Sequence, residues 1–308
     1  MRVVSLFFSI CNLCAWMPIG WGFMNSHGMR QVVTSVSLIS KRSNLNHRFL
    51  SDKFRQGLVV CMSADSCSEV NAEECEVGTE WNGPELPPIS STSKRLFLVR
   101  HGEVVNPGGD RPVFYGALDV PLSPLGELEA KAAGRYLSQF DLQNVAASPL
   151  SRAIFGANQV LSTQKNNNDK ELLVLDGFTE LDRGAWCGKT KDEIGPENMA
   201  KFDACDPNAT PKGGESYPQL KQRVLEARDE LLEKTHLGKA SAVVSHLQVT
   251  RSMLSEALGI PTEEMVNLKV ATASISCIDY DPSTGTKTVH FQSFKPDAGL
   301  QASKDLAN

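Results

Sequence analysis

The sequence lacks the features of several large protein classes. Its 31 basic and 36 acidic residues give a formal net charge of −5, so the chain has no overall positive field that would attract nucleic acid or anionic lipid. Beyond residue 17, no apolar run approaches the roughly 18 residues that a membrane span needs. No internal repeat is visible, and no acidic cluster has the spacing of a metal site. With 41% hydrophobic residues, the sequence instead predicts a globular protein with one or two packed domains.

Cysteine is also used sparingly where the chain is expected to fold. Five of the eight cysteines precede residue 94, and the other three, Cys187, Cys205 and Cys277, are far apart. Three widely spaced thiols do not make a paired disulfide framework. Cys11 and Cys14 have CxxC spacing, but they lie in an apolar segment, where hydrophobic filling explains them better than metal or redox chemistry.

Charge is distributed in three blocks along the chain. Residues 1–63 carry seven basic residues and one acidic residue, whereas residues 64–93 carry seven acidic residues and no basic one. The remainder, residues 94–308, is nearly balanced. We therefore expect a targeting presequence, an acidic turn-rich linker, a folded domain over residues 94–295 and a tail over residues 296–308.

The first block, residues 1–63, has the composition of a targeting presequence. Residues 3–16 form an apolar stretch typical of a signal peptide, and residues 25–63 are rich in Ser, Arg and Asn, which is typical of a transit peptide. The two in series resemble the bipartite presequences of algae with complex plastids, in which Gly22-Phe23 would mark the signal cleavage point. The block predicts a plastid protein; the alternative is a secreted protein with a disordered pro-segment.

From residue 94, strand-like and helix-like patterns alternate. Four short apolar runs have the length of buried strands: residues 96–99, 144–147, 172–175 and 240–245. Helical periodicity is found between them, over residues 123–140, over residues 148–161 and around Leu220, Val224, Ala227 and Leu231. A final pair of strands is expected over residues 275–280 and 287–294. This alternation predicts a three-layer α/β/α sandwich with a mainly parallel central sheet.

Charged side chains follow three of these apolar runs. Arg100 and His101 follow the first run, Arg152 follows the second, and His246 follows the fourth. Because the carboxyl ends of parallel strands meet at one edge of a sheet, we expect these side chains to converge there. Two arginines match the oxygens of a phosphoryl group, and a neutral imidazole can attack phosphorus to form a phosphohistidine. The sequence therefore predicts phosphoryl transfer at this edge.

The departing alkoxide of such a reaction needs a proton donor. Glu180 follows the third apolar run and could serve if a dry neighbourhood raises its pKa. Asp182 is the alternative donor if Glu180 has another role. Asp182 and Arg183 could equally pair with each other at the site or face solvent.

Four segments resemble, in sequence and in order, the motifs of the histidine phosphatase superfamily, also called phosphoglycerate mutase-like. They are residues 98–103 (LVRHGE), 148–153 (SPLSRA), 180–186 (ELDRGAW) and 243–246 (VVSH), and residues 213–216 (GGES) resemble a further family loop. The resemblance covers about residues 94–295 and implies a phosphoglycerate mutase-like fold. It also implies that His101 is the phosphorylated nucleophile and Glu180 the proton donor, and that Arg100, Arg152 and His246 hold the phosphoryl group.

Three short segments depart from the family pattern. Val104 stands where a hydroxyl residue is common, and Asn106, a candidate substrate contact, comes one residue early. We therefore expect one hydrogen bond to the phosphate to be absent or to be supplied by another residue. Leu247-Gln248 replaces a frequent pair of glycines and would narrow the pocket beside the second histidine. Cys187 stands where an acidic or amide residue is common. None of these departures removes a charged catalytic residue.

The substrate pocket is less well defined by the sequence. Tyr115 and Gly116 are candidate substrate contacts in the loop after the first run, where a simple turn fits equally well. Residues 188–211 are too few for the lid of the dedicated mutases, which favours the compact branch that includes alpha-ribazole and broad-specificity phosphatases. We therefore expect a phosphatase of small phosphorylated metabolites that needs no metal and no cofactor. The alternatives are mutase-type phosphoryl transfer and a catalytically idle phosphoester-binding or scaffold protein.

Overall fold

The computed structural model describes residues 83–165, 170–297 and 299–300. The predicted presequence, residues 64–82 of the predicted linker and most of the predicted tail lie outside the described residues, so their roles stay predictions. The described part of the linker, residues 83–93, has neither helix nor strand. Its Leu86 and Ile89 nevertheless pack against one of the two hydrophobic clusters of the domain.

The strands and helices that the sequence patterns predict are all present, and the structure has three further α-helices that these patterns do not predict. The strands are β1 (Lys94–Arg100), β2 (Leu142–Ala147), β3 (Leu172–Val174), β4 (Ala240–Ser245), β5 (Ile275–Asp281) and β6 (Thr286–Phe294). The α-helices are α1 (Pro124–Leu137), α2 (Ser151–Ser162), α3 (Lys191–Ile194), α4 (Pro196–Asp203), α5 (Tyr217–Glu233) and α6 (Leu247–Ala257). Short 3-10 helices lie at Asp176–Phe178, Gly184–Trp186, Pro207–Ala209 and Thr262–Asn267.

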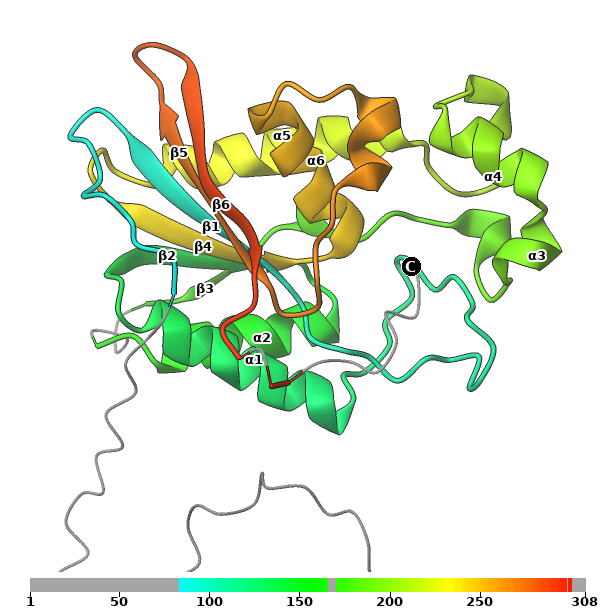
Figure 1. The fold of residues 1–308 in the computed structure, drawn as a ribbon, viewed down its shortest axis with the longest axis horizontal. Coiled ribbons are helices and arrows are strands. Elements are labelled where there is room, and N and C mark those ends of the chain that lie inside the picture. The colour runs from blue at the N-terminus through cyan, green and yellow to red at the C-terminus, as the bar shows by residue number, and fades with distance from the viewer. Residues whose placement is uncertain (1–82, 166–169, 298, 301–308) are drawn as a thin grey trace, which may run out of the picture. The chain divides into compact units, whose positions relative to one another are not determined.

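The strands form one sheet in the order β3-β2-β4-β1-β5-β6 (Figure 1). The first four pair in parallel, whereas β5 is antiparallel to both of its neighbours. In the register of β1 and β4, Arg100 lies opposite Ser245. The residues that follow these two strands therefore meet at the same edge of the sheet, as the sequence predicts.

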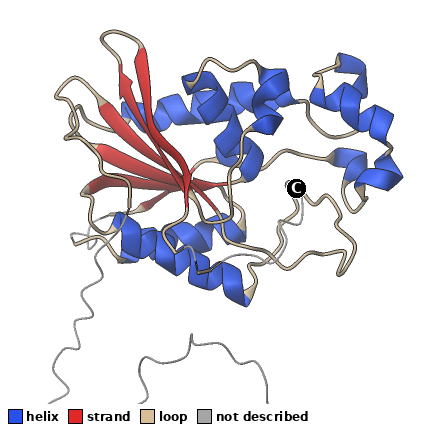
Figure 2. Cartoon of the chain, in the orientation of Figure 1, coloured by secondary structure: helices blue, strands red, loops and turns tan. Residues whose placement is uncertain are grey.

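Helices cover the two faces of the sheet, and Figure 2 shows the strands between them. The alternation of side chains along β1 explains both layers, because successive residues of a strand point to opposite faces. Leu96 and Leu98 belong to a core cluster with residues of α5 and α6, whereas Phe97 and Val99 belong to a second cluster with residues of α1 and α2. The α/β/α fold class is confirmed.

Local signals fix where several helices begin. Ser123 caps α1 by accepting a hydrogen bond from the Gly126 N–H, and Pro124 occupies the first turn, where a missing N–H costs nothing. Ser216 and Gln219 form a capping box at the start of α5. The periodicity of the first helix extends to Phe140, but α1 ends at Leu137. In the part of the chain that the structure describes, no helix is long and apolar enough to cross a membrane.

Candidate active site

His101 lies directly after β1 and is only 2% exposed. Its Nδ1 is 2.7 Å from the carbonyl oxygen of Gly102. A carbonyl only accepts hydrogen bonds, so Nδ1 carries the proton of the neutral ring and Nε2 keeps its lone pair. Nε2 is buried without a hydrogen-bond partner among the described residues. The structure thus presents an unprotonated, uncommitted nitrogen at the edge of the sheet.

His246 follows the neighbouring strand β4 and lies against His101. The two ring centroids are 5.1 Å apart, with an angle of 61° between the ring planes. The Nε2 atom of His246 is 2.7 Å from the hydroxyl of Ser148, which follows β2. Its Nδ1 is buried without a hydrogen-bond partner in the described part of the chain. Ser148 therefore fixes the second imidazole from a third strand end.

Two buried arginines complete the predicted cluster. Arg100 is the last residue of β1, and its Nη1 donates to the carbonyl oxygen of Val270 at 2.6 Å. Arg152, in the first turn of α2, donates from Nη1 and Nη2 to the carbonyl oxygens of Leu118 and Gly116, both at 2.8 Å. Its Nε is buried and has no partner among the described residues. Backbone carbonyls hold both guanidinium groups in place.

The electrostatics of the cluster keep both imidazoles neutral. Burial, and then the positive charges of Arg152 and Arg100, hold the pKa of His101 well below its ordinary value. Burial and the charge of Arg152 lower the pKa of His246 in the same direction, with smaller contributions from His101 and Arg100. The only carboxylate within 4 Å of Arg152 in the described chain is Asp119, at 3.9 Å. The positive charges of these two arginines, next to neutral imidazoles, favour a bound anion.

The lowered pKa values predict that the folded protein loses stability as the pH falls below about 6.5. In this range the imidazoles of the unfolded chain take up protons and those of the folded chain do not, so the unfolded state binds more protons. The free energy of unfolding should then decrease by up to about 1.4 kcal/mol per pH unit for each histidine. Urea unfolding at pH 7 and pH 5 measures this slope. The double variant His101→Asn/His246→Asn should show a smaller slope, and equal slopes in the two proteins would contradict the prediction.

Glu180 lies beside the cluster and is 1% exposed. Its Oε1 accepts from the N–H of Leu181 at 2.7 Å, and its Oε2 lies 3.3 Å from the N–H of Gln248, in the first turn of α6. The N-terminus of a helix favours a nearby carboxylate, which explains how α6 holds this side chain. Asp182, the alternative donor, is exposed and accepts from the N–H of Gly184 at 2.8 Å.

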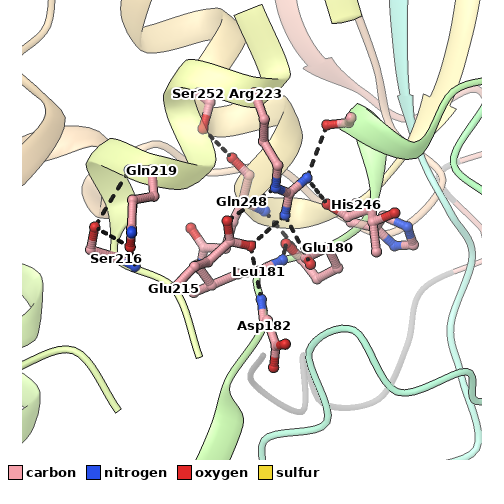
Figure 3. A network of polar contacts seen from close by, with 12 residues as sticks. Glu180, Leu181, Asp182, Glu215, Ser216, Gln219, Arg223, His246, Gln248 and Ser252 are labelled. Carbon is pink, nitrogen blue, oxygen red and sulfur yellow. Dashed lines mark hydrogen bonds and ion pairs between the residues drawn. The ribbon is translucent and has the colours of Figure 1, made fainter. Parts of the chain in front are cut away.

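An arginine from α5 fixes the loop that carries Glu180 (Figure 3). Arg223 donates to the carbonyl oxygens of Gly177, Thr179 and Glu180, at 2.9, 2.7 and 3.2 Å. It also forms an ion pair with Glu215, whose Oε1 accepts from the N–H of Asp182 at 3.0 Å. Three carbonyls and one carboxylate on a single guanidinium leave the loop little freedom, so Arg223 positions Glu180 through the backbone.

The comparison with protein families decides the class of this site. The model of the histidine phosphatase superfamily (branch 1) matches residues 96–292, which include every predicted catalytic residue. The chain belongs to the histidine phosphatase superfamily. The resemblance seen in the sequence motifs is confirmed, and the chain is a hydrolase of phosphoric monoesters.

Several histidine phosphatase relatives are similar to the folded part. Phosphoserine phosphatase 1 of Hydrogenobacter thermophilus is 30% identical over 188 residues, which are 60% of this chain and 85% of that protein. The 2-carboxy-D-arabinitol-1-phosphatase of Triticum aestivum is 28% identical over 227 residues, 72% of this chain but only 44% of that longer protein. Among solved structures, the alpha-ribazole phosphatase from Shigella flexneri is 25% identical with a TM-score of 0.54, over 65% of this chain and 96% of its own. These likenesses fix the family and the fold.

The structure brings most, but not all, of the predicted histidine phosphatase residues together. Gly116 contacts Arg152 through its carbonyl oxygen, and the ring of Tyr115 lies 5.4 Å from the guanidinium carbon of Arg152. Asn106 instead makes a local contact, since its Oδ1 accepts from the N–H of Gly108 at 2.8 Å. A role for Asn106 in substrate binding stays a prediction.

Three supporting residues were not predicted from the sequence. Ser148 contacts His246, the backbone N–H of Gln248 contacts Glu180, and Arg223 clamps the loop before it. Ser148 and Gln248 lie inside or next to the recognised segments, but nothing in their spacing reveals the partner. Arg223 is one of several charged residues on an amphipathic helix. Its role could be found only from the loop carbonyls that it meets in three dimensions.

Proposed function

We propose that the protein hydrolyses a small phosphorylated metabolite through a phosphohistidine at Nε2 of His101, without a metal ion. The observation that carries the proposal is this nitrogen itself. It is unprotonated, buried, without a hydrogen-bond partner among the described residues, and close to the positive charges of Arg152 and Arg100. A nucleophile and a site for the dianion are thus ready before substrate binds.

The reaction follows in two steps. In the first, Nε2 of His101 attacks phosphorus, the ester P–O bond breaks, and Glu180 gives its proton to the leaving alkoxide. Arg100, Arg152 and His246 stabilise the charge on the phosphoryl oxygens during the transfer. In the second, Glu180 takes a proton from water, the resulting hydroxide attacks phosphorus, and the P–N bond breaks. Inorganic phosphate and neutral His101 are restored.

The short segment after the proton donor favours hydrolysis over transfer to a second substrate. Residues 188–211 form only α3, α4 and one 3-10 turn before α5. A mutase must keep water from its phosphoenzyme and hold its product for the return transfer, which needs a larger cover. We therefore infer that water is the usual acceptor of the phosphoryl group.

The test is phosphate release from p-nitrophenyl phosphate by the purified full chain in the presence of EDTA. We expect turnover, and no more than about a twofold change when Mg²⁺ is added, because the arginines and histidines supply the positive charge that a metal supplies elsewhere. Among the described residues, no group of three His, Cys, Asp or Glu side chains could hold a metal ion. Activity lost in EDTA and restored by Mg²⁺ would contradict metal independence, and no activity in either condition would favour an idle binding protein.

A further inference from the structure

A cavity of about 690 Å³ opens beside the catalytic cluster, and most of the charged side chains that line it are positive. Arg100 lies in its wall, and Leu247 and Gln248 line it next to the second histidine. Four other cationic side chains line it, those of Arg183, Lys191, Arg251 and Lys269, together with the carboxylate of Asp203. The volume lies within the range of small-molecule sites. The other catalytic residues, including His101 and Arg152, are not part of its lining.

Arg183 is the most unusual of these cations. It is 2% exposed, and its guanidinium carbon lies 4.4 Å from the ring centre of Phe114 and 5.7 Å from that of Phe202. Its Nη1 is buried without a hydrogen-bond partner among the described residues, while its charge interacts with the hydroxyl of Tyr217 and the carboxylate of Asp203. Burying an arginine in this way is costly unless an anion completes its hydrogen bonds. The sequence leaves open whether Arg183 pairs with Asp182 at the site or faces solvent. In the structure it does neither.

Arg251, on α6, adds a second guanidinium to the cavity. Its Nε donates to the carbonyl oxygen of Leu268 at 2.8 Å, and its remaining close partner is the neutral amide of Gln248 at 3.5 Å. Burial lowers the pKa of Arg251, and the charges of Arg100 and Arg183 lower it further. The three arginines therefore repel one another across the cavity; Tyr217 and Glu180 offset part of this repulsion, and an anion bound between the arginines would relieve it further.

Asp203 is the one carboxylate among the residues that line this cavity, and it interacts with Arg183, Lys191 and Arg251. Burial raises its pKa above the ordinary value, and its Oδ1 accepts a hydrogen bond from the hydroxyl of Tyr217 at 3.3 Å. Lys191 and Lys269 also line the cavity, are exposed, and add two further positive charges. The phosphoryl group is matched by Arg100, Arg152 and the two histidines. The positive side chains that line the cavity are therefore not needed for the phosphoryl group and can bind another anion.

We propose that this cavity binds a second anionic group, a carboxylate or a phosphate, on the same substrate whose phosphoryl group is transferred to His101. Arg183 and Arg251 hold the group with their paired N–H donors, and Lys191 and Lys269 attract it from solvent. The proposal rests on the proposed function, which it narrows to phosphomonoesters that carry a further negative charge. It also assigns Arg183 as a specificity-determining residue.

Matched substrate pairs test the proposal with the full-length protein. The pairs differ only by the second anion: 3-phosphoglycerate with glycerol 3-phosphate, phosphoserine with phosphoethanolamine, and fructose 1,6-bisphosphate with fructose 6-phosphate. In at least one pair we expect kcat/KM to be about 10- to 100-fold higher for the member with the extra anion, the factor expected of one or two charged hydrogen bonds in a buried site. Equal values within all three pairs, with p-nitrophenyl phosphate hydrolysed, would overturn the proposal and leave the proposed function standing.

Variants then identify the residues responsible. In Arg183→Met, the ratio of kcat/KM values within the preferred pair should fall to near 1. Lys191→Glu/Lys269→Glu changes only exposed positions, should fold normally, and should lower the ratio by about 3- to 10-fold at low ionic strength. Arg135→Met, at an exposed position on α1, is the matched control and should keep the wild-type ratio. A ratio unchanged in both cavity variants would overturn the proposal.

An inactive wild-type protein would contradict the proposed function separately. Isothermal titration calorimetry of the same pairs would then compare binding without turnover. Tighter binding of the member with the second anion, lost in Arg183→Met, would still support the cavity as an anion site. Equal binding of both members would overturn it.

Discussion

Replacing His101 with alanine should reduce turnover by on the order of 10⁴-fold or more, because the proposed reaction has no other nucleophile. We do not expect the neighbouring His246 to take over through its Nε2, because the hydroxyl of Ser148 already engages that nitrogen. His101 is buried at the end of β1, so alanine leaves a small cavity. His101→Asn, which is closer in size, is therefore measured alongside it. Thermal unfolding of both variants shows whether the loss of activity is separate from any loss of stability.

The phosphohistidine itself can be trapped. Wild-type protein mixed with ³²P-labelled substrate and quenched in base within milliseconds should carry label that acid releases, as expected of a phosphorus–nitrogen bond. His101→Ala should carry none, whereas His236→Ala, which changes an exposed histidine after α5, should be labelled like the wild type. Label of equal amount on His101→Ala would assign the nucleophile to another residue.

The convergence of the catalytic side chains could be predicted because it follows from simple periodicities. The run Leu96–Val99 is apolar at every position, which only a strand buried on both faces requires, and both faces are indeed covered. Once the strands are parallel, residues directly after them meet at one edge whatever the strand order. Arg100, His101 and His246 therefore come together without knowledge of which strand lies beside which.

Helix α6 shows where this reasoning fails. It was not predicted, although it follows His246 directly, because four of its buried residues are polar: Gln248, Thr250, Ser252 and Ser255. The serines satisfy their hydroxyls within the helix, Ser252 on the carbonyl oxygen of Gln248 and Ser255 on that of Ser252. Polar residues at half of its eight buried positions interrupt the apolar pattern, which makes this helix harder to recognise from hydrophobic periodicity.

Contacts between segments that are far apart in the sequence are the second feature that sequence patterns do not predict. The bond between Ser148 and His246 spans 98 positions, and that between Glu180 and the Gln248 N–H spans 68. The charged cavity has the same origin, since Arg183 and Arg251 come from separate elements and each is unremarkable in its own segment. Composition and spacing describe a residue's neighbours along the chain, whereas these functions depend on neighbours across it.

Glu180→Gln should lower turnover of alkyl phosphates by on the order of 10²- to 10⁴-fold, because glutamine keeps the shape of the side chain but has no proton to give to the alkoxide. The carbonyl oxygen of glutamine can still accept from the N–H of Leu181, and only the longer contact with the N–H of Gln248 is lost, so the loop held by Arg223 should stay in place. With p-nitrophenyl phosphate the leaving group is stable as an anion. The first step then needs no acid, and the loss should be much smaller.

The ratio of the two losses separates the role of a proton donor from a structural one. Glycerol 3-phosphate and p-nitrophenyl phosphate are compared by kcat in the wild type, in Glu180→Gln and in Asp182→Asn. Asp182 is exposed and bonded to the N–H of Gly184, so Asp182→Asn should affect both substrates alike and by less than about tenfold. Equal losses on both substrates in Glu180→Gln would mark Glu180 as a residue that orients phosphate or the loop. A loss specific to the alkyl phosphate in Asp182→Asn would instead move the proton donor to Asp182.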